Sequence, residues 1–194
     1  MHISNDDYEH NNAGAGLCSI LIHMKNQAFI DGQNLRYSTS KADIPWTVDL
    51  TRFRVYLEKK YNVTEAYYFL GAFYPEHQDM YTSIQRSGYI LIFRKHSETM
   101  KTIKKGNVDT DIVFHIMRKI ADQEKFEKIV LVSGDGDYYK MVQYLIEKEK
   151  FERLLAPNEK RMSSLYKTLE PKYYAFLNRE DVRNKIEYKQ AGPS

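Results

Sequence analysis

The stretch IVLVSGDGDYYKMV, residues 129–142, holds the pattern that decides the fold. Its four leading apolar residues run into Ser133-Gly134, and two aspartates, Asp135 and Asp137, follow with a glycine between them. A short apolar run bounded by turn residues is typical of a buried strand, and Tyr138 to Lys148 continues with apolar residues at helical spacing. The stretch therefore predicts a buried strand, a carboxylate-rich loop and a helix in direct succession.

Elements of these two kinds alternate along the chain on both sides of this stretch. Apolar runs predict strands at Gln27 to Ile30, Thr64 to Phe73, Tyr89 to Phe93, Lys128 to Val132 and Phe151 to Ala156. Helical spacing predicts helices at Val48 to Tyr61, His77 to Ser87, Val108 to Ala121, Tyr138 to Lys148 and Met162 to Leu169. The predicted fold class is α/β, a three-layer α/β/α sandwich around a mostly parallel central sheet of about five strands.

The chain of 194 residues suits one main domain with a sizeable core. Residues 1–23 are polar, rich in Asn and Gly, and without period, so we expect a mobile N-terminal extension or a non-native leader. The domain is expected to span residues 24–170. Residues 171–194 are expected to form a tail that packs partly on the domain through its aromatic residues.

The composition limits the classes of function. No apolar run approaches the roughly 20 residues of a membrane span, so no membrane partner is expected. The single cysteine, Cys18, excludes an internal disulfide and a cysteine-based zinc site, and it fits a cytoplasmic location. A net charge of +3 is compatible with a polyanionic partner. The 16 tyrosines fill the core and surface or offer stacking platforms for unpaired bases, and both alternatives remain open.

Aspartates follow the strand ends at which a parallel sheet forms its sites. Asp31 follows the first predicted strand, Asp135 and Asp137 follow the fourth, and Asp109 and Asp111 open the helix before the fourth. If strands one and four are neighbours, these carboxylates converge, and a divalent cation would relieve their mutual repulsion. Oxygen-only ligands favour Mg²⁺ or Mn²⁺ over zinc.

Each aspartate also has a purely structural alternative. Asp137 and Asp109 both stand where a helix N-cap is expected, and Asp111 would favour the dipole of the first turn. Residues two apart on a helix point roughly 200° apart, so Asp109 and Asp111 should not both face one site. Asp31 before Gly32 suits a simple turn. These structural roles can explain any one of the aspartates. They explain less well why all of the aspartates occur together.

Three segments carry a family resemblance. They are FIDGQNL (Phe29 to Leu35), KGNVDTDIV (Lys105 to Val113) and LVSGDGDYYKMV (Leu131 to Val142). In order and spacing they resemble the signature blocks of the NYN domain family, closest to the LabA-like (DUF88) branch of the PIN-like nucleases. The resemblance covers about residues 24–170. Tyr138 stands where the family more often has Phe.

The resemblance implies a PIN-like fold and one or two divalent ions held by carboxylates. Carried over by motif, the principal ligands would be Asp31, Asp109 and Asp135, with Asp137 as an outer or second-metal ligand. Asn34 would orient Asp31 or touch the phosphate. Ser133 would support the loop beside the substrate, and Asp111 is a less favoured member of the site.

A basic segment, residues 94–105, precedes the second block and could hold a phosphodiester backbone or be a solvated connection. Lys105 is the member most closely tied to the motif. Arg36 and Tyr37 follow the first block, and Tyr37 would stack a base or be an ordinary surface residue.

The resulting hypothesis is a metal-dependent ribonuclease acting on single-stranded RNA, and the resemblance also allows a homodimer. The alternative is a non-catalytic nucleic-acid-binding or regulatory module. An aspartyl phosphatase is disfavoured, because Asp31 is followed by Gly32-Gln33-Asn34 and the second acid of its DxDx(T/V) motif is missing. Nucleotide-cofactor enzymes are disfavoured too, since neither GxGxxG nor GxxxxGK[ST] occurs.

Overall fold

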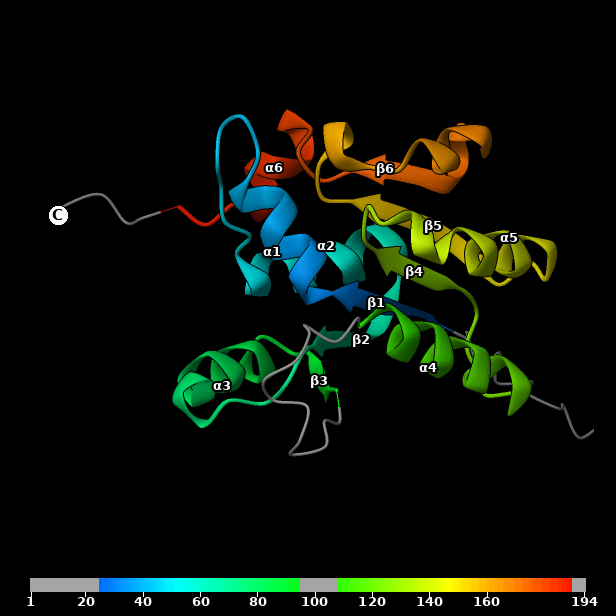
Figure 1. Cartoon of the computed structure of the whole chain (residues 1–194), viewed down its shortest axis with the longest axis horizontal. Coiled ribbons are helices and arrows are strands. Elements are labelled where there is room, and N and C mark those ends of the chain that lie inside the picture. Colours follow the sequence, from blue (N-terminus) through cyan, green and yellow to red (C-terminus); the bar gives the residue numbers. More distant parts are fainter. Residues whose placement is uncertain (1–24, 95–107, 190–194) are drawn as a thin grey trace, which may run out of the picture.

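Six parallel strands form the centre of the structure (Figure 1). The computed structural model describes residues 25–94 and 108–189. The strands are β1 (Asn26–Asp31), β2 (Val63–Leu70), β3 (Ile90–Phe93), β4 (Ile129–Val132), β5 (Phe151–Ala156) and β6 (Tyr174–Phe176). Their order in the sheet is β3-β2-β1-β4-β5-β6. The predicted three-layer α/β/α fold is confirmed, with β6 added to the five strands expected.

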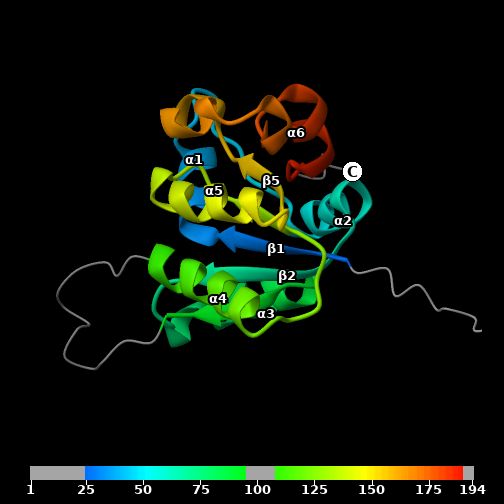
Figure 2. The same cartoon turned by 90° about the vertical axis from the view of Figure 1, so that its right-hand side faces the viewer.

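Helices cover both faces of the sheet. They are α1 (Gly32–Ser40), α2 (Leu50–Tyr61), α3 (Gln78–Arg86), α4 (Asp109–Ala121), α5 (Tyr139–Glu147) and α6 (Glu180–Ile186). Helices α4 and α5 cover one face, and they lie in front of the strands in Figure 2. Helices α1, α2, α3 and α6 bury their apolar residues in the cluster on the other face.

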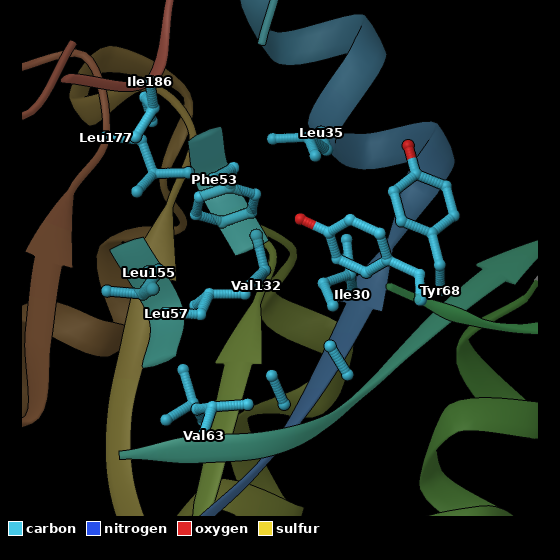
Figure 3. Close-up of a cluster of buried hydrophobic side chains, with 14 of the residues drawn as sticks. Ile30, Leu35, Phe53, Leu57, Val63, Tyr68, Val132, Leu155, Leu177 and Ile186 are labelled. Carbon is cyan, nitrogen blue, oxygen red and sulfur yellow. The ribbon is translucent and has the colours of Figure 1, made fainter. Parts of the chain in front are cut away.

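Strand alternation divides the core between the two faces. Ile30 and Val132 point towards Phe53 and Leu57 of α2, where residues of the C-terminal segment also gather (Figure 3). Phe29, between two residues of that cluster, packs instead into the cluster under α4 and α5. Because both faces are covered, β1 and β4 are buried along their whole lengths, which explains the apolar run of β4 and the apolar centre of β1, Ala28 to Ile30.

Most predicted elements lie within a few residues of their observed bounds, but one prediction is wrong. Met162 to Leu169 forms no α-helix; Ser164–Thr168 is a 3₁₀ turn. The backbone N–H of Ser163 donates to the carbonyl of Gly134, and the Ser163 side chain accepts from Leu165. These bonds tie the segment to the loop after β4 and replace helical bonding.

Three elements were missed: α1, β6 and α6. Helix α1 has few apolar residues, of which only Leu35 is buried, so it carries almost no periodic signal. Both β6 and α6 lie in the predicted tail, and Leu177 and Ile186 join the core next to α2. The predicted extension, residues 1–23, lies outside the described residues. Within the described chain, no helix has both the length and the apolar character needed to cross a membrane.

Candidate metal centre

The sheet reverses its strand order between β1 and β4. The chain passes from β1 outwards to β2 and β3, then returns to the other side of β1 for β4, β5 and β6. Ile30 pairs with Val132 at the carboxyl ends of the two central strands. Asp31, the last residue of β1 and the N-cap of α1, and Ser133, the first residue of the loop after β4, therefore lie next to each other at the switch point, where open parallel sheets form their sites.

Three of the predicted carboxylates meet at this point. Asp109 enters from the first turn of α4, while Asp135 and Asp137 come from the loop after β4. One oxygen of each lies within 4.8 Å of the others. Asp109 is buried, Asp135 is half-buried and Asp137 is exposed. We call these three residues the acid cluster; it is open to solvent on the Asp137 side.

Asp31 lies beside the acid cluster and is connected to it through Tyr138. The Tyr138 hydroxyl is 2.6 Å from Asp109 Oδ1 and 3.1 Å from Asp31 Oδ2. The ring of Tyr138 is fully buried. A hydroxyl has one proton, so it donates to one carboxylate at a time, and the shorter distance favours Asp109. Residues of all three sequence blocks are thus linked through one buried hydroxyl group.

Burial is the main influence on the Asp31 carboxyl group. It raises the pKa of Asp31 to about 6, and the nearby carboxylates of Asp109 and Asp135 act in the same direction. Hydrogen bonds from the Asn34 backbone and the Tyr138 hydroxyl oppose the rise in pKa. Placing this group next to the acid cluster is therefore electrostatically unfavourable without a neutralising charge.

Asn34 joins the first turn of α1 to the loop after β4, and Ser133 braces that loop internally. The backbone N–H of Asn34 donates to Asp31 Oδ1 at 2.9 Å, and its side-chain Oδ1 accepts from the N–H of Gly134 at 2.9 Å. Ser133 Oγ accepts from the N–H of Asp135 at 3.1 Å. Ser133 is fully buried, so its side chain is not accessible to a substrate in this structure.

The structure also decides which aspartates act as caps. Asp31 is the N-cap of α1, so it occupies a helix start where the sequence suggested a turn. Asp135, and not Asp137, caps the 3₁₀ turn Gly136–Tyr138. Asp109 is the first residue of α4, and Val108, which occupies the N-cap position, makes no side-chain cap hydrogen bond. The cap explanation therefore fails for Asp109 and Asp137, the two residues for which the sequence suggested it.

Two glycines of the motifs are required by close approach. A Cβ atom on Gly32 would lie 2.4 Å from a ring carbon of Tyr68 and 2.8 Å from the carbonyl oxygen of Phe69. A Cβ atom on Gly136 would lie 2.6 Å from Ser163 Oγ. Glycine after Asp31 and between the two loop aspartates thus lets the site pack tightly.

The other predicted site residues are more dispersed. Asp111 points away from the acid cluster and forms an ion pair with Arg94 at 4.0 Å, as its helical position relative to Asp109 suggested. Arg36 is exposed on α1. Lys105 lies outside the described residues. Substrate binding by these three residues stays a prediction.

A pocket of about 480 Å³ opens at the acid cluster. Its lining residues are Asn34, Gly134, Asp135, Gly136, Asp137, Arg161, Ser163 and Leu165. Sequence reasoning missed Arg161 and Ser163, which follow β5 and so also lie at the carboxyl edge of the sheet. The strand-end rule, applied to β5 as well as to β1 and β4, would have found them.

The donor set suits a hard divalent cation. Its ligand atoms are carboxylate oxygens from two chain segments, with neither sulfur nor imidazole among them. Such a set matches Mg²⁺ or Mn²⁺. Asp31 and Asp109 are also both buried and lie close together, so their negative charges repel each other unless a cation neutralises them.

Comparison with known proteins shows the family of the chain and supports its fold. The family model described as "NYN domain" matches residues 27–175. The Low amplitude and bright protein LabA of Synechococcus elongatus (strain ATCC 33912 / PCC 7942 / FACHB-805) is 28% identical over 130 residues, which are 62% of this chain and 67% of that protein. A crystal structure of a protein of unknown function from Vibrio parahaemolyticus RIMD 2210633 has a TM-score of 0.66 at 17% identity, covering 86% of this chain and 98% of that one.

Proposed function

Because the chain belongs to the NYN domain family, in its LabA-like branch of the PIN-like nucleases, we propose that it is a metal-dependent nuclease that hydrolyses phosphodiester bonds in RNA. The observation that carries the proposal is the acid cluster, in which oxygens of Asp109, Asp135 and Asp137 approach within 4.8 Å at the switch point of the sheet.

The acid cluster would hold the cation, Mg²⁺ or Mn²⁺. Asp109 offers a buried carboxylate that Tyr138 orients, and Asp135 is fixed by the hydrogen bonds of its own loop. Asp137 faces solvent and is placed to meet the incoming strand. Asp31 completes the negative surroundings. A divalent cation held there would lower the pKa of a water molecule and stabilise charge developing on the phosphate.

Attack by water, and not by a side chain, fits the pocket. Ser163 is the only hydroxyl side chain among the described residues that line it. Those lining residues include no histidine, lysine or cysteine that would activate Ser163 or act as a nucleophile. The single arginine, Arg161, is placed to bind negative charge.

A cleavage assay tests this proposal. Labelled single-stranded RNA and a DNA of the same sequence are incubated with wild type in Mg²⁺, Mn²⁺ or EDTA, beside Asp31→Asn and Asp135→Asn. Asp122→Asn is the matched control, because Asp122 is exposed at the opposite end of α4 from Asp109. We expect cation-dependent cleavage of RNA, lowered about 100-fold or more in the two site variants and unchanged in the control.

The opposite outcomes are equally informative. A wild-type protein that binds RNA without cutting it in any cation would support the non-catalytic binding module instead. Cleavage that persists in both site variants would place the activity outside the acid cluster. Preferential cleavage of the DNA strand would overturn the assignment of RNA as substrate while leaving the nuclease chemistry in place.

A further inference from the structure

We propose that Tyr37 and Arg161 form a nucleotide-binding platform beside the acid cluster. Tyr37 would stack one base of a single strand, and Arg161 would bind an adjacent phosphate. The inference rests on the proposed function, whose substrate it places on the surface. It concerns two residues that belong to different elements, α1 and the segment after β5, and that meet at the rim of the pocket.

The segment after β5 is fixed where it places Arg161 at this rim. The buried side chain of Asn158 donates to the carbonyl of Ser38 in α1 and accepts from the N–H of Lys160. Two residues after Arg161, the N–H of Ser163 donates to the carbonyl of Gly134 at 2.9 Å. Arg161 is thereby anchored between α1 and the loop that carries Asp135.

The guanidinium group of Arg161 is held in a defined orientation. Its Nε and Nη2 atoms donate to the carbonyl of Lys41, at 3.2 and 2.8 Å, and its Cζ lies 5.3 Å from the centre of the Tyr37 ring. Within the described part of the chain, no carboxylate comes within ion-pair distance of Arg161, and Nη1 has no hydrogen-bond acceptor. The nearby acid Asp43 pairs instead with Lys160. Donors of Arg161 are therefore available to a phosphate.

Tyr37 supplies an aromatic surface next to these donors. Tyr37 is 57% exposed, which leaves ring surface open beyond the contact with Arg161. Tyr37 lies one turn along α1 from Asn34, which lines the pocket. Residues three apart on a helix share a face at a separation of about 5–6 Å. The platform is therefore close enough to the acid cluster to hold a neighbouring nucleotide.

Charge explains why the site needs such a platform. The acid cluster would repel a phosphodiester backbone until a cation is bound, and Arg161 is the one cationic side chain among the described residues lining the pocket. A strand fixed by Arg161 and by stacking on Tyr37 would present its next phosphate to the cluster. Stacking on an aromatic side chain is tolerant of sequence, so the ligand class is a nucleotide unit of any unpaired strand.

The test measures binding separately from cleavage. Fluorescence anisotropy of a labelled single-stranded RNA is recorded with Mg²⁺ in the Asp135→Asn background, in which the proposed function predicts binding with little cleavage. The variants are Tyr37→Leu, Tyr37→Phe, Arg161→Ala and Arg161→Lys. Phe114→Leu and Arg118→Ala are matched controls, because they too form an exposed ring and arginine pair, at 5.7 Å, on α4 and outside the lining of the pocket.

We expect Tyr37→Leu and Arg161→Ala each to raise the Kd by about 5-fold to 10-fold, and both controls to leave it unchanged. Tyr37→Phe keeps a ring and should bind like the parent. Arg161→Ala should also reduce the slope of log Kd against log salt concentration by roughly 0.7, whereas Tyr37→Leu should not. Arg161→Lys should keep the salt slope but bind more weakly, because it lacks the planar fork. A merely structural role for Arg161 would not change the salt dependence.

The inference is overturned if Tyr37→Leu and Arg161→Ala bind as their controls do while the protein still cleaves RNA. That result would leave the proposed function standing. Failure of the proposed function is distinguishable, since it appears as absent cleavage in wild type whatever the binding results. Every variant could also bind single-stranded and double-stranded RNA with equal affinity. In that case the protein recognises the nucleic-acid backbone alone, and the proposed stacking of a base on Tyr37 is refuted.

Discussion

The hydroxyl group of Tyr138 lies 2.6 Å from the carboxylate of Asp109, and the contact is fully enclosed. The same hydroxyl is 3.1 Å from Asp31. A phenylalanine, which the NYN family more often has at this position, would leave the two buried carboxylates without a shared donor. In this chain the tyrosine therefore does, in part, what a bound cation would do: it makes the proximity of Asp31 and Asp109 tolerable.

Tyr138→Phe should lower the free energy of unfolding in EDTA by about 1–3 kcal/mol, because a hydrogen bond to a buried charged group is lost. Saturating Mg²⁺ or Mn²⁺ should recover part of that loss, since a cation neutralises the same carboxylates. Urea unfolding of wild type and variant, with and without cation, measures both effects.

Tyr139→Phe serves as the control for this comparison. The Tyr139 hydroxyl is 2.6 Å from the Thr168 hydroxyl, so its partner is not a carboxylate of the acid cluster. Its removal should cost the same stability with and without cation. Equal cation dependence in the two variants would show that Tyr138 does not relieve repulsion between Asp31 and Asp109.

The raised pKa of Asp31 predicts a pH dependence of stability. In the fold the pKa is about 6, against 3.8 for an ordinary aspartate, so the folded state binds the proton more tightly than the unfolded state. Stability from this group is therefore greatest at low pH and falls as the pH rises from about 4 to about 6. The loss is on the order of 3 kcal/mol at most.

Asp31→Asn isolates that contribution from those of the other acids. In EDTA, the difference in unfolding free energy between Asp31→Asn and wild type should grow in favour of the variant between pH 4 and pH 6, roughly the interval between the two pKa values. Urea titrations at several pH values give this difference. A difference that is constant across the interval would contradict the burial effect assigned to Asp31.

Gly136→Ala tests whether close packing keeps the loop aspartates in place. The new Cβ would lie 2.6 Å from Ser163 Oγ and 3.1 Å from Ser163 Cβ, so the loop or Ser163 must move. We expect a loss of about 1–3 kcal/mol in stability and weaker cation binding. The double variant Gly136→Ala with Ser163→Gly should recover part of both; strictly additive effects would exclude this contact as the cause.

Asn34→Ala tests the bond between α1 and the loop after β4. It leaves the buried N–H of Gly134 without the side-chain acceptor at 2.9 Å, which should cost about 1–3 kcal/mol of stability. Amide hydrogen exchange at Gly134 should become faster than exchange in β4, which is measured in the same experiment. Unchanged protection of Gly134 would mean that another group takes over the acceptor role.

Much of this architecture could be predicted from the sequence, because its signals are local. Short apolar runs identify β1 and β4, and the aspartates that follow these runs identify the edge of the sheet at which the site forms. The order β1 next to β4 was a condition of that prediction, and the observed pairing of Ile30 with Val132 meets it.

The features that were missed depend on contacts between distant residues. Nothing local shows that Tyr138 would reach Asp31 across 107 positions of sequence. Arg161 meets Tyr37 only because Asn158 and Ser163 bind α1 and the β4 loop. Asp135, and not Asp137, is the cap because the 3₁₀ turn Gly136–Tyr138 precedes α5. Sequence patterns locate the start of a helix only to within a few residues.

We propose that the carboxylates of Asp109, Asp135 and Asp137 form a cation site. This proposal is tested by calorimetric titration of Mn²⁺ into the metal-free protein at neutral pH, with Asp109→Asn and the control Asp122→Asn titrated in parallel. The proposal predicts saturable binding by wild type and by Asp122→Asn, and binding weakened at least about 10-fold in Asp109→Asn. Absence of saturable binding to wild type, or equal affinity in all three proteins, would contradict it.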